Sequence, residues 1–437
     1  MARSLRRARG RRLALVAAAI LVPLGLGACG SDESATPTLT WYINPDNGGQ
    51  KTLAEECSAA SGGAYQIVTQ ILPNEADQQR EQLVRRLAAS DPSVDLMSLD
   101  PPFVAEFANA GYLKAVTDPA DVEQLTADVL EGPMKTAYWE DQLVATPFWA
   151  NTQLLWYRKS VTQAAGVDPA KGDFTWDQMI DAAESQQKKV GVQARRYEGY
   201  MVWINALVSS GGGQIIENTE LGDQATPSMA SPAGDAAADV VGRLSRSSAA
   251  PADLVTAGEE EARSLFQSPD GGFMVNWPYV YSAAAKAVAD GAIEQSVVDD
   301  IGWARYPKVS SDHDSAPPLG GINLGIGAFT RYPDQTLAAV KCITSAENNA
   351  QYMVESGNPA ARAAAYDDPA VKKAFPMADL IRESIADAGP RPITPYYGDV
   401  SVSVQRTWHP PSAVTAPATP EATDAYMTEV LAGDRLL

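Results

Sequence analysis

Three residues stand where their side chains could recognise a small polar ligand: Asp100, Asn151 and Trp277. Asp100 ends the apolar run 94–99, and a carboxylate at a strand end can accept hydrogen bonds from two hydroxyls. Trp277 ends the short run 273–276 before a proline, so its flat indole can face a cleft. An indole against the C–H face of a sugar ring, with carboxylates and amides around the hydroxyls, is the physical basis of carbohydrate recognition.

Each of these residues also has a plainer interpretation. Asp100 can cap the helix that Pro101-Pro102 would start. Trp277 can be an ordinary core residue, because the chain holds nine tryptophans and 16 tyrosines. Their positions at the ends of elements favour a site over these alternatives.

The stretch 143–158, LVATPFWANTQLLWYR, is predicted to carry the chain from one body into another. Its apolar runs are too short for helices and indicate two extended segments. Pro147 has no N–H to give a sheet, so we expect it at the joint between them. Trp149, Asn151 and Gln153 follow, an aromatic face beside amides that both donate and accept hydrogen bonds. Small polar ligands are commonly trapped at such crossings between lobes.

Before this crossing, strand-like and helix-like segments alternate. Residues 39–43, 65–72 and 94–99 are predicted strands, and helices are expected to about residue 60 and over 76–89. Such alternation predicts an α/β fold with a largely parallel sheet, whose ligands gather at the carboxyl ends of its strands. Beyond the crossing, a helix over 176–190 capped by Thr175 is expected.

The N-terminus predicts export and a lipid anchor. Six arginines precede the apolar run 13–26, which is too short to cross a bilayer comfortably, and Leu26-Gly27-Ala28-Cys29 follows. This pattern resembles a lipoprotein signal, although a plain secretory signal with a chance cysteine is the alternative. We expect residues 1–28 to be removed, diacylglycerol on Cys29, and residues 29–37 to form a tether, so that the protein is held outside the cytoplasmic membrane.

Two cysteines, Cys57 and Cys342, remain after such processing. In an exported protein two cysteines are the minimum for a disulfide, and a bridge between them is expected. Two separate buried thiols are the alternative.

Composition and motifs exclude several classes of function. Removal of the six arginines leaves 28 basic against 54 acidic residues, a net charge near −26, which argues against nucleic acid as a partner. The chain has only His313 and His409, and it contains no HExxH, G-x-S-x-G or G-x-x-x-x-G-K-[ST] motif. No enzyme, metal or cofactor is therefore predicted, although so many carboxylates leave a two-carboxylate glycosidase open.

Several motifs together resemble the extracellular solute-binding proteins of ABC sugar importers, which have the maltose-binding-protein fold. The motifs are YWEDQLVATPFWANTQLLWYR, EEEARSLFQSPDGGFMVNWPYVYS, LGGINLGIGAF and PRPITPYY. Within that family the combination is most similar to trehalose-binding lipoproteins, and the resemblance runs from Leu39 almost to the C-terminus.

This resemblance implies a two-lobed, periplasmic-binding-protein-like α/β fold of the maltose-binding type (class II), with a hinge between lobes. Residues 38–147 and 301–345 would form one lobe, and 148–300 and 346–437 the other. The disaccharide contacts that it implies are Asp100, Asn151, Glu259 (or Glu260 or Glu261), Trp277, the Gly320-Gly321 backbone and Arg391, with Asn47, Asn44 and Gln78 as weaker candidates.

The implied partners are a disaccharide, trehalose first, and the permease subunits of an ABC importer driven by a cytoplasmic ATPase. Maltose, a malto-oligosaccharide and another small polar solute such as a glycerophosphodiester are the alternatives within this fold. A phosphate ligand would call for more bases than Arg391 alone.

Overall fold

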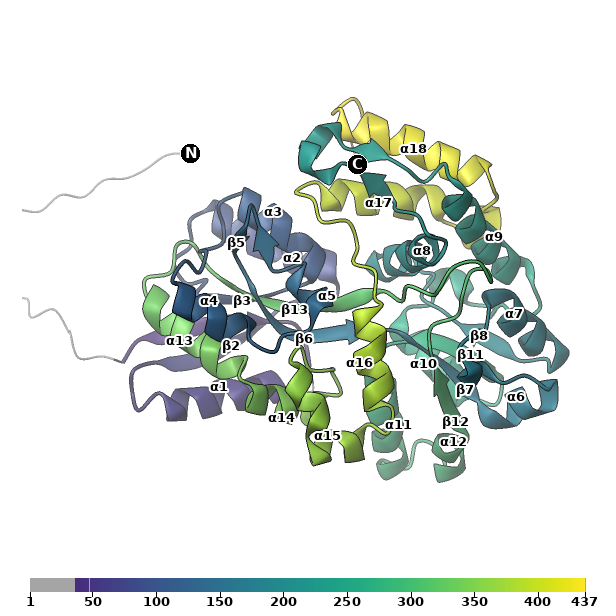
Figure 1. Cartoon of the computed structure of the whole chain (residues 1–437), viewed down its shortest axis with the longest axis horizontal. Helices are drawn as coiled ribbons and strands as arrows, with labels where there is room; N and C mark the ends of the chain where they lie inside the picture. Colours follow the sequence, from purple (N-terminus) through teal and green to yellow (C-terminus); the bar gives the residue numbers. More distant parts are fainter. Residues whose placement is uncertain (1–35, 47, 437) are drawn as a thin grey trace, which may run out of the picture. The chain divides into compact units, whose positions relative to one another are not determined.

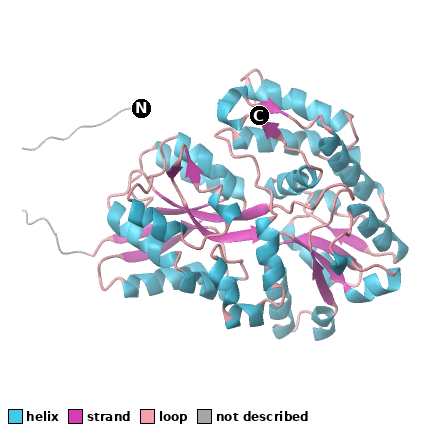
Figure 2. Cartoon of the chain, viewed as in Figure 1, coloured by secondary structure: helices cyan, strands magenta, loops and turns pink. Residues whose placement is uncertain are grey.

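The computed structural model describes residues 36–46 and 48–436. The predicted signal peptide, Cys29, most of the tether and Asn47 lie outside these residues. The described chain is a mixed α/β protein built around two sheets, each covered by helices (Figures 1 and 2). The lobe built on the five-stranded sheet is called the first lobe below, and the lobe built on the four-stranded sheet the second lobe.

The sheet of the first lobe has the strand order β2-β1-β3-β13-β6. Its strands are β1 (Thr38–Ile43), β2 (Gln66–Ile71), β3 (Leu96–Leu99), β6 (Thr146–Thr152) and β13 (Leu319–Ile326). β1 pairs in parallel with β2 and β3, while β13 is antiparallel to both β3 and β6. Every strand but β13 therefore runs in one direction, as the alternation of strands and helices predicts.

The helices of the first lobe include the two whose bounds the sequence predicts, one ending near residue 60 and one over 76–89. The helices of this lobe are α1 (Gly49–Ala60), α2 (Ala76–Ala88), α3 (Val104–Asn109), α4 (Pro119–Thr126), α5 (Glu131–Met134), α13 (Pro333–Ile343) and α14 (Ala346–Ser356). α2 buries Leu83 and Leu87 in a core shared with Leu99 of β3. A disulfide joins Cys57 of α1 to Cys342 of α13, as predicted.

The sheet of the second lobe has the order β12-β7-β11-β8. Its strands are β7 (Leu154–Arg158), β8 (Lys189–Gly191), β11 (Gly271–Asn276) and β12 (Ile301–Ala304). Its helices are α6 (Lys159–Ala165), α7 (Trp176–Ser185), α8 (Glu198–Ser210), α9 (Pro232–Arg246), α10 (Glu259–Gln267), α11 (Tyr279–Ala289), α12 (Gln295–Asp299), α17 (Tyr397–Trp408) and α18 (Ala418–Leu431). α15 (Pro369–Ala374) and α16 (Ala378–Ala386) precede α17, and β4 (Tyr138–Trp139), β5 (Gln142–Leu143), β9 (Ile216–Glu217) and β10 (Thr226–Pro227) form two small hairpins.

Thr175 caps α7 in a capping box with Gln178, as expected, but the helix ends at Ser185 instead of near Val190. Gln187 has a φ of 53°, which a helix does not tolerate, and the chain then enters β8. The expected helix over 176–190 is therefore wrong in its last turn.

The crossing between the lobes also differs from the expectation. Pro147 lies inside β6, where the register with β13 shifts between Trp149 and Pro147, and such a bulge accommodates a residue without an N–H. The joint is Gln153, the single residue between β6 and β7. Placing Pro147 at the joint was therefore wrong.

The expected lobe limits need two revisions. Residues 301–304 pair with β7 and so belong to the sheet of the second lobe. α14, expected in the second lobe, packs Tyr352 against Phe148 of β6, with ring centroids 4.7 Å apart. Pairing between distant segments decides both points, and local sequence patterns carry no such information.

Candidate functional site

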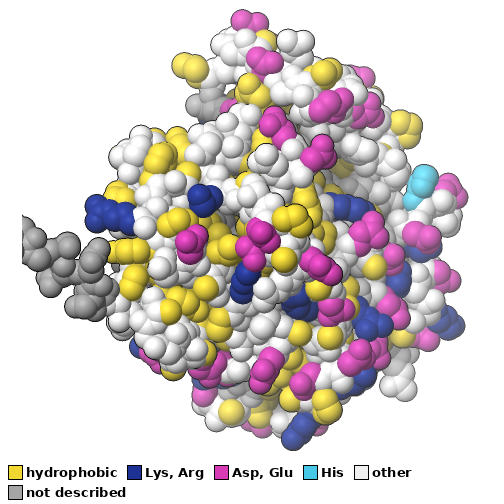
Figure 3. All heavy atoms as spheres, turned by 60° about the vertical axis from the view of Figure 1, so that its left-hand side comes forward, with side chains coloured by type: hydrophobic (Ala, Val, Ile, Leu, Met, Phe, Trp, Pro, Cys, Tyr) yellow, Lys and Arg dark blue, Asp and Glu magenta, His cyan; other side chains and the backbone are white. Residues whose placement is uncertain are grey.

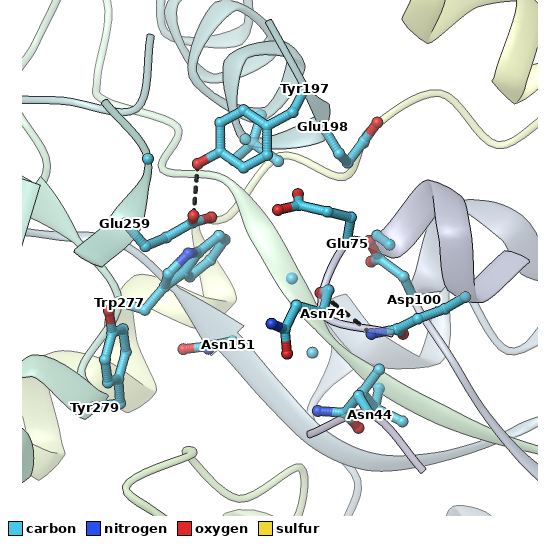
Figure 4. Close-up of a pocket in the computed structure, with 18 of the residues that line it drawn as sticks. Asn44, Asn74, Glu75, Asp100, Asn151, Tyr197, Glu198, Glu259, Trp277 and Tyr279 are labelled. Carbon is cyan, nitrogen blue, oxygen red and sulfur yellow. Dashed lines mark hydrogen bonds between the residues drawn. The ribbon is translucent and has the colours of Figure 1, made fainter. Parts of the chain in front are cut away.

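A cavity of about 580 Å³ lies between the two lobes. Seven of the eight predicted ligand contacts line it: Asp100, Asn151, Glu259, Trp277, Gly320, Gly321 and Arg391. The eighth, Asn47, lies outside the described residues. Asn44 also lines the cavity, whereas Gln78 lies in a separate depression on α2. Figure 4 shows Asp100 and Asn44 on one side of the cavity and Glu259 and Trp277 on the other.

Asp100 does not act as a helix cap. It precedes the short 3-10 turn Pro101–Phe103, and its side chain makes no capping hydrogen bond. Instead, both carboxylate oxygens accept hydrogen bonds from the guanidinium of Arg391, one of them over 3.0 Å. Asp100 follows β3 of the first lobe, while Arg391, in the loop between α16 and α17, also pairs with Glu198 of α8 in the second lobe, so this ion pair joins the two lobes.

Glu198, at the start of α8, holds the other side of Arg391 at 2.5 Å. Tyr397 and Ser401 of α17 also donate hydrogen bonds to its carboxylate. Burial raises the pKa of Glu198 from its ordinary value of 4.5 to about 7, against the opposing effect of the Arg391 charge. Arg391 keeps one buried donor, Nε, that has no hydrogen-bond partner among the described residues.

Trp277 follows β11 and is held there by Asn276. The side-chain oxygen of Asn276 accepts a 2.8 Å hydrogen bond from the Trp277 N–H, and the amide nitrogen donates to the Glu259 carbonyl. The indole rests against Gly320 of β13, where a Cβ atom would lie 2.9 Å from the ring. A glycine at 320 therefore makes room for the indole in the cavity wall.

Glu259 is the first residue of α10, where the helix dipole favours a negative charge. The Tyr197 hydroxyl donates a 2.5 Å hydrogen bond to its carboxylate (Figure 4). Burial raises the pKa of the Glu259 carboxyl, and the hydrogen bond from Tyr197 lowers it in part. The neighbouring Glu260 accepts hydrogen bonds from Arg263 and Tyr279. Glu261 accepts a hydrogen bond from the Gly258 N–H. The Glu259 carboxylate makes neither of these contacts and faces the cavity.

The joint between the lobes has its own polar contacts. The Asn151 side-chain oxygen accepts a 3.1 Å hydrogen bond from the Thr152 N–H, which orients the amide in the cavity wall. The Gln153 side chain donates to Gln193, which in turn donates to the Val275 carbonyl. These bonds tie the joint to β11 of the second lobe.

Several residues of the cavity were missed by the sequence interpretation. They are Asn74, Glu75, Ala76, Gln79, Arg195, Tyr197, Glu198, Tyr279 and Asn358, among others. Asn74 and Glu75 lie three and four residues beyond the end of β2, so the rule that ligands gather at the carboxyl ends of strands could have found them. Arg195, Tyr197 and Glu198 follow β8. The helix expected over 176–190 overlaps this strand, so the strand was not predicted.

The charge of the cavity is negative. Its carboxylates are Glu75, Asp100, Glu198, Glu259, Glu260 and Glu261, and its basic residues are Arg195 and Arg391. Both arginines are already paired with carboxylates, Arg195 with Glu75 and Arg391 with Asp100 and Glu198. An anionic ligand would therefore find no free cation in these walls.

Within residues 36–46 and 48–436, His, Cys, Asp and Glu side chains form no group of three suited to a metal ion. No helix in this part of the chain is both long enough and apolar enough to span a membrane. On the face drawn in Figure 3, acidic and basic side chains are interspersed.

Two lobes joined by β6 and β7, with a polar and aromatic cavity between them, define the class of two-lobed solute-binding proteins. Residues 65–350 match the family model of bacterial extracellular solute-binding proteins, and the chain belongs to that family. The maltose-bound MalE3 of T. maritima has the same fold, with a TM-score of 0.78 and 25% identity over 91% of this chain and 100% of that one. The GacH receptor of Streptomyces glaucescens, known with acarbose, has a TM-score of 0.72 at 20% identity, covering 92% and 100%.

Curated relatives match over a shorter length. A probable ABC transporter-binding protein of Deinococcus radiodurans is 30% identical over 268 residues, which are 58% of this chain and 59% of that protein. The diacetylchitobiose-binding protein DasA of Streptomyces coelicolor is 22% identical over 54% of each chain. The chain thus spans between half and three fifths of the length of these relatives.

Proposed function

We propose that this protein captures a sugar outside the cytoplasmic membrane and delivers it to the permease of an ABC importer. One observation carries the proposal: Trp277, Asp100, Asn151 and Arg391, which are far apart in the sequence, line one cavity between two lobes. A half-buried indole with carboxylates and amides around it matches the apolar faces and the hydroxyls of a sugar.

The charge of the cavity supports an uncharged ligand. Arg195 and Arg391 are both engaged by carboxylates, so a phosphate or carboxylate group would meet more acids than bases. This argues against a glycerophosphodiester, and it leaves neutral saccharides as the class that the walls favour.

Trehalose is the disaccharide that we propose first, because the sequence motifs of the chain resemble those of trehalose-binding lipoproteins. A cavity of about 580 Å³ falls in the range of about 300–1,000 Å³ that is usual for small-molecule sites. Maltose or a malto-oligosaccharide is the second candidate, and it is favoured by the likeness to the maltose-bound MalE3.

In the proposed mechanism the lobes close over the sugar by rotation about Gln153 and the neighbouring strands. The ligand raises the population of the closed form by binding it more tightly than the open form, and the permease recognises the closed form. The sequence has no G-x-x-x-x-G-K-[ST] motif, so a cytoplasmic ATPase partner supplies the energy.

We also propose that the protein is anchored outside the cell membrane by lipid on Cys29 after removal of residues 1–28.

We propose that one lobe comprises residues 38–152 with 319–356, and the other comprises residues 154–304 with the C-terminal segment from 389. These limits follow the sheet partners of β6, β7, β12 and β13 and the packing of α14.

A thermal-shift panel of trehalose, maltose, sucrose, glucose and glycerophosphocholine tests ligand class and identity together. We expect trehalose to raise the melting temperature most, and glycerophosphocholine not to raise it. Calorimetry then measures the affinity for the sugar with the largest shift. A response to glycerophosphocholine alone would overturn the proposal of a sugar ligand.

We propose binding without turnover, since the cavity carboxylates are engaged by cations, hydroxyls or their own helix. Incubation with trehalose and with maltose, followed by an assay for released glucose, checks this directly. Steady release of glucose would establish a glycosidase instead.

A further inference from the structure

Glu75 and Arg195 form an ion pair across the cavity, from one lobe to the other. Glu75 precedes α2, whose Leu83 and Leu87 pack in the core with Leu99 of β3. Arg195 follows β8, and its backbone N–H donates to the Ala257 carbonyl of the second lobe over 2.9 Å. The Arg195 Nη2 and Glu75 Oε1 atoms are 2.9 Å apart, and both residues line the cavity.

Arg195 is held in place from the side of the second lobe. Its guanidinium lies over the ring of Tyr197, 4.3 Å from the centroid. The Tyr197 hydroxyl is in turn fixed by its hydrogen bond to Glu259. The series Glu75, Arg195, Tyr197 and Glu259 therefore runs without a break from the first lobe to the wall of the second lobe.

This pair differs from the other ion pair between the lobes. The side chains of Asp100 and Arg391 are 16% and 3% exposed, whereas those of Glu75 and Arg195 are 35% and 39% exposed. A buried pair is costly to separate, because each partner would be left without compensation. A pair that water already reaches can be separated and hydrated cheaply, so it can form and break as the lobes move.

We propose that Glu75 and Arg195 are positioning residues that act as a latch: their ion pair stabilises the closed arrangement of the lobes and is broken on opening. The latch depends on the proposed function in one respect, namely that closing the lobes serves to capture a ligand. The pair is a contact between lobes, and the closed state gains from it whether or not a sugar is bound.

A charge swap tests the latch. Glu75→Arg and Arg195→Glu each place two like charges across the cavity, and the double variant restores an opposite pair in reversed order. Glu75 makes no side-chain capping bond to α2, so its replacement removes no helix cap. The matched control is the swap of Glu81→Arg with Arg85→Glu, an exposed pair within α2 of the first lobe.

Two measurements are made on each variant: the radius of gyration of the ligand-free protein by small-angle X-ray scattering, and the affinity for trehalose by calorimetry. We expect each single reversal to enlarge the radius of gyration and to weaken binding by up to about fivefold, the limit that an exposed pair allows. The double variant should recover both values, and the control variants should match the wild type.

The outcomes separate the latch from other roles. If the double variant binds as weakly as the single variants while its radius of gyration recovers, the two side chains also contact ligand, and the latch stands. If neither single reversal changes the radius of gyration, or the double variant fails to recover it, the latch is overturned. If trehalose fails to bind the wild type, the proposed ligand fails, and the scattering still decides the latch.

Discussion

The carboxylate of Asp100 accepts two hydrogen bonds from the guanidinium of Arg391, and this ion pair joins the end of β3 to the loop before α17. Asp100→Asn should keep the shape of the side chain and remove its charge, leaving Arg391 with Glu198 alone. We expect a loss of about 3 kcal/mol in the free energy of unfolding, together with loss of saturable sugar binding. Denaturant titration and calorimetry measure the two effects.

Glu81→Gln, an exposed change on α2, is the control for Asp100→Asn. If the Asp100 variant binds sugar normally, with or without a loss of stability, then the Asp100 carboxylate is not part of the binding site.

Trp277→Ala should weaken sugar binding by about 1–3 kcal/mol, because the ligand would lose the stacking and burial that the indole provides. Trp277→Phe should fall between this variant and the wild type, since it retains a smaller ring. Calorimetry measures both affinities, and a melting curve checks that each variant is folded. Equal affinity in all three proteins would show that this wall does not contact the ligand.

Gly320 and Gly321 should respond differently to alanine. At 320 the new Cβ would crowd the Trp277 ring at 2.9 Å, so we expect weaker sugar binding, by about 1–3 kcal/mol, with a normal fold. Gly321 has a φ of 122° and its Cβ would overlap the Trp149 carbonyl, so Gly321→Ala should lower the melting temperature. The reverse pattern, with Gly320→Ala unstable and Gly321→Ala only weak in binding, would contradict this assignment.

Stability should depend on pH through Glu198. Its pKa rises from 4.5 to about 7 on folding, so the folded protein holds the proton more tightly than the unfolded chain. The resulting stabilisation is complete below about pH 4.5 and is lost as the pH rises through about 7. Melting temperatures between pH 4 and 8 should therefore decline in the wild type relative to Glu198→Gln. Parallel curves for the two proteins would show that Glu198 does not titrate in this range.

The disulfide between Cys57 and Cys342 closes a loop with a sequence separation of 285. The unreduced protein should be lighter by two hydrogens than the reduced protein, which mass spectrometry detects directly. By the chain-entropy estimate, Cys57→Ser with Cys342→Ser should lower the free energy of unfolding by up to about 5 kcal/mol. Unchanged stability in the double variant would show that packing of α1 on α13 suffices without the bridge.

The sequence by itself determined the local elements and the side chains at their ends. Alternation of strands and helices predicts the first sheet, and Asp100, Asn151 and Trp277 stand out because each lies at a strand or at its end. These features depend on residues within a few positions of one another, so they can be interpreted without the fold.

Only the tertiary structure decided how these parts meet. It placed β12 beside β7, moved the joint from Pro147 to Gln153, and paired Asp100 with Arg391 and Glu75 with Arg195. Both ion pairs join residues more than a hundred positions apart, and a carboxylate shows no local sign of which guanidinium it will meet. Partner choice at such distances follows from the packing of the lobes, which local sequence patterns do not specify.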